Sequence, residues 1–132
     1  MHLCKYVIIL LFFSSCSSNL EDFRREGKTL SHLLVQDLKQ VHTRGELVVM
    51  APTLKKKIEK LVDLMIKAKQ HQLKHPEEVF ESREENFSEE LLEELRRIYA
   101  LDGGRETMER IEHEALLRLD AFNRSLLKSL QK

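Results

Sequence analysis

The chain has little of several residue types that most proteins use freely. Its 132 residues include no tryptophan, four glycines, two prolines and two cysteines. The scarcity of glycine and proline, together with abundant Leu, Glu, Lys and Arg, favours helix over sheet. Net charge is also lacking, because 22 basic residues balance 22 acidic ones, and this excludes a global attraction to nucleic acid or to an acidic membrane. The run from Tyr6 to Phe13 would rise only ~12 Å as a helix, too short to cross a hydrocarbon core of ~30 Å.

The first sixteen residues have the pattern of the leader of an exported protein. Lys5 precedes the apolar run, which has the length and basic flank of the hydrophobic region of a signal peptide. The run ends in Phe13-Ser14-Ser15-Cys16. This segment resembles the bacterial lipobox, in which Leu, a small residue, and then Gly, Ala or Ser precede an invariant Cys. Phe13 departs from that pattern, since Leu is commonest at its position.

The resemblance implies a bacterial lipoprotein. A signal peptide of residues 1–15 would be cleaved, Cys16 would carry the lipid, and residues 16–19 would form a polar tether. Cys4 would leave with the leader, so no pair of cysteines would remain for a disulfide. Acyl chains anchor a protein because each buried CH₂ contributes ~0.8 kcal/mol. The alternatives are an ordinary cleaved signal peptide and an uncleaved hydrophobic tail.

The resemblance also implies a location. In lipoproteins of enterobacteria, Asp directly after the lipidated Cys favours the inner membrane, whereas Ser17 follows Cys16 in this chain. We therefore expect an exported protein that is lipid-anchored at the cell membrane or the outer membrane.

Residues 20–132 are predicted to form one all-α domain, a small antiparallel bundle of three to four helices. Apolar residues at helical spacing predict helices over about 20–42, 52–75, 86–101 and 106–130.

Three local signals set these predicted boundaries. Pro52 is favoured at the first position of a helix, and Pro76 disfavours helix at the residue before it. Asp102-Gly103-Gly104 predicts the end of the third helix, and residues 43–45 predict a turn. The short apolar run 47–50 is interpreted as a helical turn or a buried connector, because a lone strand has no partner in this sequence.

The sequence offers little for catalysis. His71 and His75 are four residues apart and share a helix face, a spacing that can hold a metal, but the sequence supplies no clear third ligand. His113-Glu114 begins like the zinc-protease motif HExxH, but Leu117 occupies the place of the second histidine. We therefore expect no enzyme, no cofactor and two solvated histidines at a helix end.

Charge is distributed unevenly along the neutral chain. Residues 55–74 contain seven lysines and two acidic residues, and residues 77–94 contain nine glutamates and one arginine. One interpretation is that consecutive antiparallel helices lie side by side with these charges facing each other, where exposed pairs contribute little. The others are that Lys55–Lys57 touch anionic headgroups or peptidoglycan near the tether, or that one patch docks an envelope protein.

The expected function is that of a lipid-anchored helical adaptor in the cell envelope. One version resembles a pilotin, a small helical lipoprotein that escorts a secretion-system subunit, by analogy of size and anchor alone. The alternative is a structural envelope lipoprotein or surface antigen without a dedicated partner, which self-associates. The membrane is the first expected partner, through the lipid on Cys16, and nucleic acid is not one. The candidate protein-binding surface is the end of the last apolar stripe, at Leu119, Phe122, Leu126 and Leu130.

Overall fold

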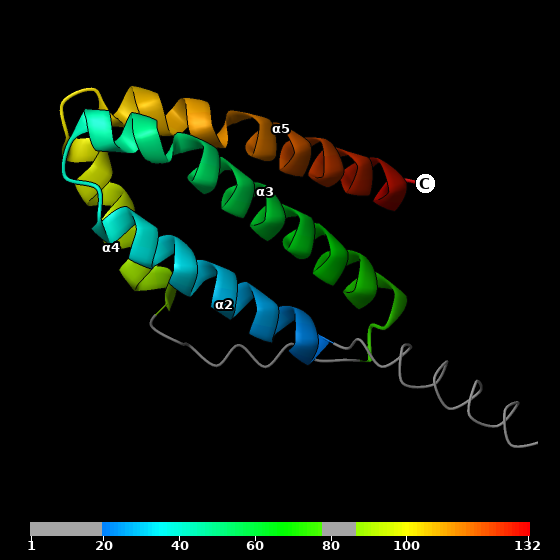
Figure 1. Ribbon diagram of the computed structural model, residues 1–132. Coiled ribbons are helices and arrows are strands. Elements are labelled where there is room, and N and C mark those ends of the chain that lie inside the picture. Colours follow the sequence, from blue (N-terminus) through cyan, green and yellow to red (C-terminus); the bar gives the residue numbers. More distant parts are fainter. Residues whose placement is uncertain (1–19, 78–86) are drawn as a thin grey trace, which may run out of the picture.

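The computed structural model describes residues 20–77 and 87–132, and within these ranges the chain is an all-α bundle without strands (Figure 1). The helices are α2 (Leu20–Lys39), α3 (Arg44–Lys74), α4 (Phe87–Ala100) and α5 (Gly104–Leu130). The predicted fold class is confirmed. Among the described residues, no helix is both long enough and apolar enough to cross a membrane. The predicted signal peptide, Cys16 and the tether lie outside the described residues.

The direction of α5 follows from the position of α4. Helices α2 and α3 run antiparallel, and α4 brings the chain back to the end of the bundle where α3 begins (Figure 1). Helix α5 therefore runs in the same direction as α3. Two ion pairs agree with this direction. Lys55 meets Glu114 at 3.0 Å, and Asp63, eight residues further along α3, meets Arg118, four residues further along α5, also at 3.0 Å.

Helix α4 lies across the bundle from α3. Both α3 and α4 pack on α2 and on α5, but no Cα of α3 comes within 8 Å of a Cα in the described helix α4. At 1.5 Å per residue, α4 is only ~21 Å long and α5 is ~40 Å long. The bundle therefore has a closed half, made of α4 with residues 34–41, 44–62 and 104–115, where four helices meet. In the open half, residues 20–33, 63–74 and 116–130, the described residues supply three helices.

The core lies in the closed half, because only there can side chains from four helices meet. The cluster of buried apolar residues joins α2, α3, α4 and α5 and extends along α3 and α5 as far as Val62 and Ala115. Its largest fully buried side chains are Leu38, Val41, Leu47, Leu54, Ile98 and Met108.

The start of α3 corrects the sequence prediction. The helix begins at Arg44, eight residues before the expected start at Pro52, and it includes residues 47–50. The reason is a cap, because the hydroxyl of Thr43 accepts a hydrogen bond from the Glu46 amide at 3.2 Å, and the Glu46 carboxylate accepts one from the His42 amide at 2.7 Å. Pro52 then lies inside the helix, where it cannot donate a hydrogen bond.

The other predicted boundaries agree with the structure to within a few residues. Helix α2 ends at Lys39, slightly before the expected residue 42, and α3 ends at Lys74, just before His75 and Pro76 as predicted. The turn between α4 and α5 also falls at the predicted glycines, although α5 begins at Gly104 and so two residues earlier than expected.

Candidate binding surface

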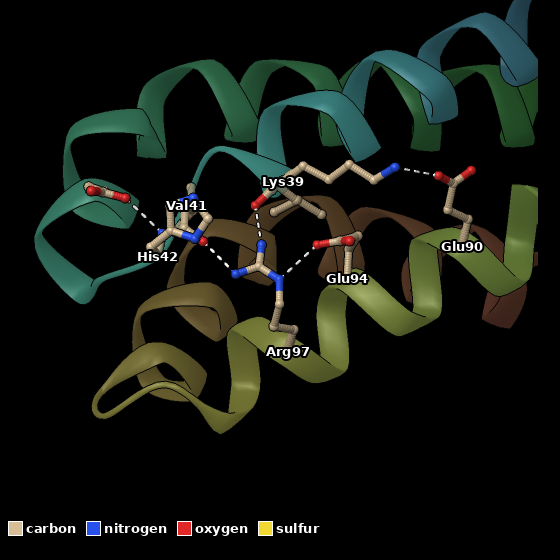
Figure 2. Close-up of polar contacts among 8 residues, drawn as sticks. Lys39, Val41, His42, Glu90, Glu94 and Arg97 are labelled. Carbon is tan, nitrogen blue, oxygen red and sulfur yellow. Dashed lines mark hydrogen bonds and ion pairs between the residues drawn. The ribbon is translucent and has the colours of Figure 1, made fainter.

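A single arginine fixes α4 to the end of α2. Arg97 points from α4 toward the last turn of α2, and its guanidinium donates to the carbonyl oxygens of Leu38 at 2.5 Å and Val41 at 2.6 Å (Figure 2). Its Nε donates to the Glu94 carboxylate at 2.9 Å. The carbonyls at a helix C-terminus have no partner within the helix, so the planar fork of arginine suits them both geometrically and electrostatically.

A second, more exposed contact lies about two helical turns away along α4. The ammonium of Lys39 meets the carboxylate of Glu90 at 2.7 Å (Figure 2). The hydrogen bond and the attraction between the two charges raise the pKa of Lys39 and lower the pKa of Glu90. Exposed pairs of this kind contribute little to stability, so the pair mainly sets how α4 lies against α2.

The interpretation that the lysine-rich and glutamate-rich helices face each other is wrong for the described glutamates of α4, at positions 89, 90, 93 and 94. The lysines of α3 instead pair with its two true neighbours: Lys57 binds Asp37 of α2, and Lys55 binds Glu114 of α5. The pairing raises the pKa of Lys55 and lowers that of Glu114. The physical reason is the crossing of the bundle by α4, which places this helix opposite α3 and not beside it.

Helix α4 covers α5 at Glu112. The hydroxyl of Tyr99 donates to both carboxylate oxygens of Glu112 at 3.3 Å. Burial raises the pKa of the Glu112 carboxyl, and the hydrogen bond from Tyr99 offsets part of that rise. Burial, and secondly the charge of Glu112, raise the pKa of the Tyr99 hydroxyl. This contact marks the side of α5 that faces α4.

Leucines continue along that side of α5 into the open half. Positions three and four residues apart on a helix share a face, so the line through Glu112 passes through 116, 119, 123, 126 and 130. Four of these five positions are leucines, at 116, 119, 126 and 130. The side chains of Leu116 and Leu130 are 50% and 75% exposed. We name the line of leucines 116, 119, 126 and 130 the α5 stripe.

The predicted partner residues divide into two groups. Leu119 packs against the core, and Phe122 and Leu126 are half-buried, whereas Leu130 is exposed. The exposed leucines of α5 that the sequence prediction missed are Leu116, Leu117 and Leu127. A single helical stripe cannot show them, because their exposure depends on where α4 stops.

The face of α3 shows the same change from the closed to the open half. Ile58 is 7% exposed, but Met65, seven residues later on the same face, is 50% exposed. Met65 therefore lies at the surface although it continues the apolar face of α3. A large apolar side chain exposed on both α3 and α5 marks this side of the open half as a candidate contact surface.

The two candidate metal ligands form an aromatic stack. The ring of His71 lies edge-on to Phe23 of α2 with centroids 5.7 Å apart, and its centroid is 4.6 Å from that of His75. His75 also meets the carboxylate of Glu77 at 3.3 Å. Within residues 20–77 and 87–132 no group of three or more His, Cys, Asp or Glu side chains is arranged to hold a metal ion.

One hollow lies between α2 and α3 in the open half. Its volume is about 570 Å³, and Phe23, Leu30 and Leu64 contribute its apolar lining beside several charged residues. Its lining contains no histidine or cysteine, and two of its carboxylates, Asp22 and Asp63, are in ion pairs with Arg25 and Arg118.

Comparison of the chain with protein-family models, with curated proteins and with solved structures finds no match. Its function is therefore argued from its own residues.

Proposed function

We propose that this protein is an exported bacterial lipoprotein, anchored by a lipid on Cys16 at the cell membrane or outer membrane, and that its helical domain is a non-enzymatic adaptor. The observation that carries the proposal is the order of features at the N-terminus. A basic residue, an eight-residue apolar run and Phe13-Ser14-Ser15-Cys16 follow one another without a gap.

The position of the domain supports a short anchor. Helix α2 begins at Leu20, so only residues 17–19 separate it from Cys16. The four residue steps from Cys16 to Leu20 span at most ~14 Å when fully extended. A domain on such a tether stays at the membrane surface, as an adaptor for a membrane process must.

The α5 stripe supports the adaptor role. Leu116 and Leu130 are exposed although they continue the side of α5 that α4 covers in the closed half. An envelope protein with an amphipathic helix, such as the subunit that a pilotin escorts, would pack on this stripe as α4 packs in the closed half. We place the centre of the partner site at Leu116, where the closed half gives way to the open half.

Incorporation of radiolabelled palmitate in bacterial cells tests the anchor. We expect the wild-type chain to be labelled and to sediment with membranes. The Cys16→Ala variant should be unlabelled, and Cys4→Ala, which alters only the leader, should be labelled like wild type. A wild-type chain without label, or equal labelling of the Cys16→Ala variant, would refute the lipoprotein assignment.

Purification of the lipidated protein after crosslinking in cells tests the adaptor role. We expect one envelope protein in stoichiometric amount, lost in Leu116→Glu and retained in the control Val49→Glu. Val49 suits the control because it is 82% exposed and lies in the closed half, on α3. Concentration-dependent self-association without such a partner would favour the structural lipoprotein instead.

A further inference from the structure

Three helix ends lie at one level of the bundle. Because α3 and α5 run in the same direction and Arg118 donates to the carbonyl oxygen of Glu59, a further twelve residues along each helix bring His71 level with Leu130. Because α2 runs the opposite way and Phe23 meets His71, the start of α2 at Leu20 lies level with the end of α3. Figure 1 shows the start of α2 and the ends of α3 and α5 at the same end of the molecule. We name this the tether end, because Cys16 precedes it by four residues.

Apolar and basic side chains are exposed together at the tether end. Leu73, Leu127 and Leu130 are 49%, 61% and 75% exposed. Three lysines accompany them on the last turns of α3 and α5 and just beyond α5, at positions 74, 128 and 132. No ion pair involves these three lysines within the part of the chain that the structure describes.

Two of the described acidic groups near the same end pair with arginines of their own helix. On α2, Glu21 meets Arg24 at 3.4 Å and Asp22 meets Arg25 at 4.0 Å, whereas Glu77 beyond α3 meets only the ring of His75, and Glu26 has no ion pair among the described residues. The three lysines therefore leave an excess of positive charge over these two glutamates at this end. Leucines beside lysines are the composition of helical surfaces that rest in a lipid interface.

We propose that the tether end docks on the phospholipid surface itself. Leu127 and Leu130 enter the boundary between headgroups and acyl chains, and the neighbouring lysines bind lipid phosphates. This inference rests on the proposed lipid anchor, which keeps the tether end within ~14 Å of the bilayer and so gives the surface a high effective concentration there. The bilayer is therefore the occupant that this end meets before any other.

This docking orients the whole domain. Leu116 lies fourteen residues from Leu130 along α5, or ~21 Å, so the upper part of the α5 stripe stands clear of the lipid and open to a protein. Val49 lies twenty-five residues from Lys74 along α3, or ~37 Å. The closed half therefore lies on the side of the domain away from the membrane. Lys55–Lys57 lie in the closed half as well, and Lys55 and Lys57 already bind carboxylates, so they are not the lysines that meet the headgroups.

Fluorescence quenching by brominated lipid tests the orientation. The thiol of Cys16 is used by the lipid and Cys4 leaves with the signal peptide, so one introduced cysteine is the only free thiol. Leu130→Cys and Leu127→Cys report on the tether end, and Val49→Cys is the matched control at an exposed apolar position of the other end. Each lipidated full-chain variant is labelled with bimane and reconstituted in vesicles of phosphatidylethanolamine and phosphatidylglycerol with brominated acyl chains.

We expect the labels at 127 and 130 to be quenched several-fold more strongly than the label at 49. Equal quenching at both ends would mean that the domain lies on its side, and no quenching at either end in vesicle-bound protein would mean that the tether holds it clear of the lipid. Either result overturns the docking and leaves the lipid anchor intact. A chain that carries no lipid and does not sediment with the vesicles removes the anchor, and with it both proposals.

Discussion

Arg97 and Leu38 join two helices through one hydrogen bond, from the guanidinium in α4 to the last-turn carbonyl of α2, at 2.5 Å. The same guanidinium reaches the carbonyl oxygen of Val41 just beyond the helix end, and it is a second donor to the Leu38 oxygen, which already accepts from the Val41 amide at 3.1 Å. The contact is what holds the short α4 at one end of the bundle. It thereby decides which part of α5 is covered and which part is left for a partner or for lipid.

Replacement of Arg97 by methionine should destabilise the protein strongly. The apolar part of the side chain is kept, but the Val41 carbonyl oxygen and the Glu94 carboxylate lose this donor, and the Leu38 oxygen keeps only the Val41 amide. We expect the free energy of unfolding to fall by about 2–3 kcal/mol in a urea titration. Arg96→Met is the control, because it removes the same charge from an exposed position of α4. Equal losses for both variants would contradict the role given to Arg97.

The turn between α4 and α5 should require glycine at two positions. A Cβ at Gly104 would lie 2.1 Å from the carbonyl oxygen of Ile98, and Gly103 has a φ of 69°. We expect Gly104→Ala to cost about 1–3 kcal/mol and Gly103→Ala about 1–2 kcal/mol of stability, measured by thermal unfolding. Gly45→Ala, where the new methyl would lie 3.8 Å from Thr43 Oγ1, should instead be neutral or stabilising. A destabilised Gly45→Ala beside an unaffected Gly104→Ala would refute this account.

Removal of the cap of α3 should weaken the corrected start of that helix. Thr43→Ala leaves the Glu46 amide without its side-chain acceptor, and we expect a loss of about 1 kcal/mol in the free energy of unfolding. Thr53→Ala, at an exposed position about three turns into the same helix, is the control and should cost nothing. If both variants unfold like wild type, the helix does not depend on Thr43 for its start.

Glu112 should make stability depend on pH. Burial raises its pKa in the folded protein above the ordinary 4.5, so the folded state binds the proton more tightly than the unfolded state. Its contribution to stability is therefore present at acid pH and is lost as pH rises through the folded pKa. Glu112→Gln cannot ionise, so it avoids this loss of stability, and its amide oxygen still accepts from the Tyr99 hydroxyl.

We expect Glu112→Gln to be more stable than wild type by about 0.5 kcal/mol at neutral pH and to match it near pH 4. Urea titrations across this pH range measure the difference. Glu93→Gln, which removes the same charge from an exposed position of α4, controls for the change in net charge. An advantage of Glu112→Gln that is the same at both pH values would show that ionisation of Glu112 is not its cause.

The open and closed halves explain why the candidate surface was only partly predictable. Helical spacing indicated an apolar stripe at the end of α5 and named Leu119, Leu126 and Leu130. Spacing alone does not separate a leucine that packs inside from one at the surface. That distinction needs the position at which α4 ends over α5, near Glu112. Leu116 and Leu127 were missed for this reason.

The sequence by itself determined the helical class and most helix boundaries, because those signals act within one turn. Proline after His75 and the glycines at 103 and 104 act through their own backbones, whatever the rest of the chain does. Tertiary structure alone decided which helices are neighbours. Charge patterning along the chain favoured α3 beside α4, but a short α4 held by Arg97 to the end of α2 lies across the bundle and turns α5 parallel to α3. That arrangement depends on contacts between residues more than fifty positions apart, and no local pattern contains it.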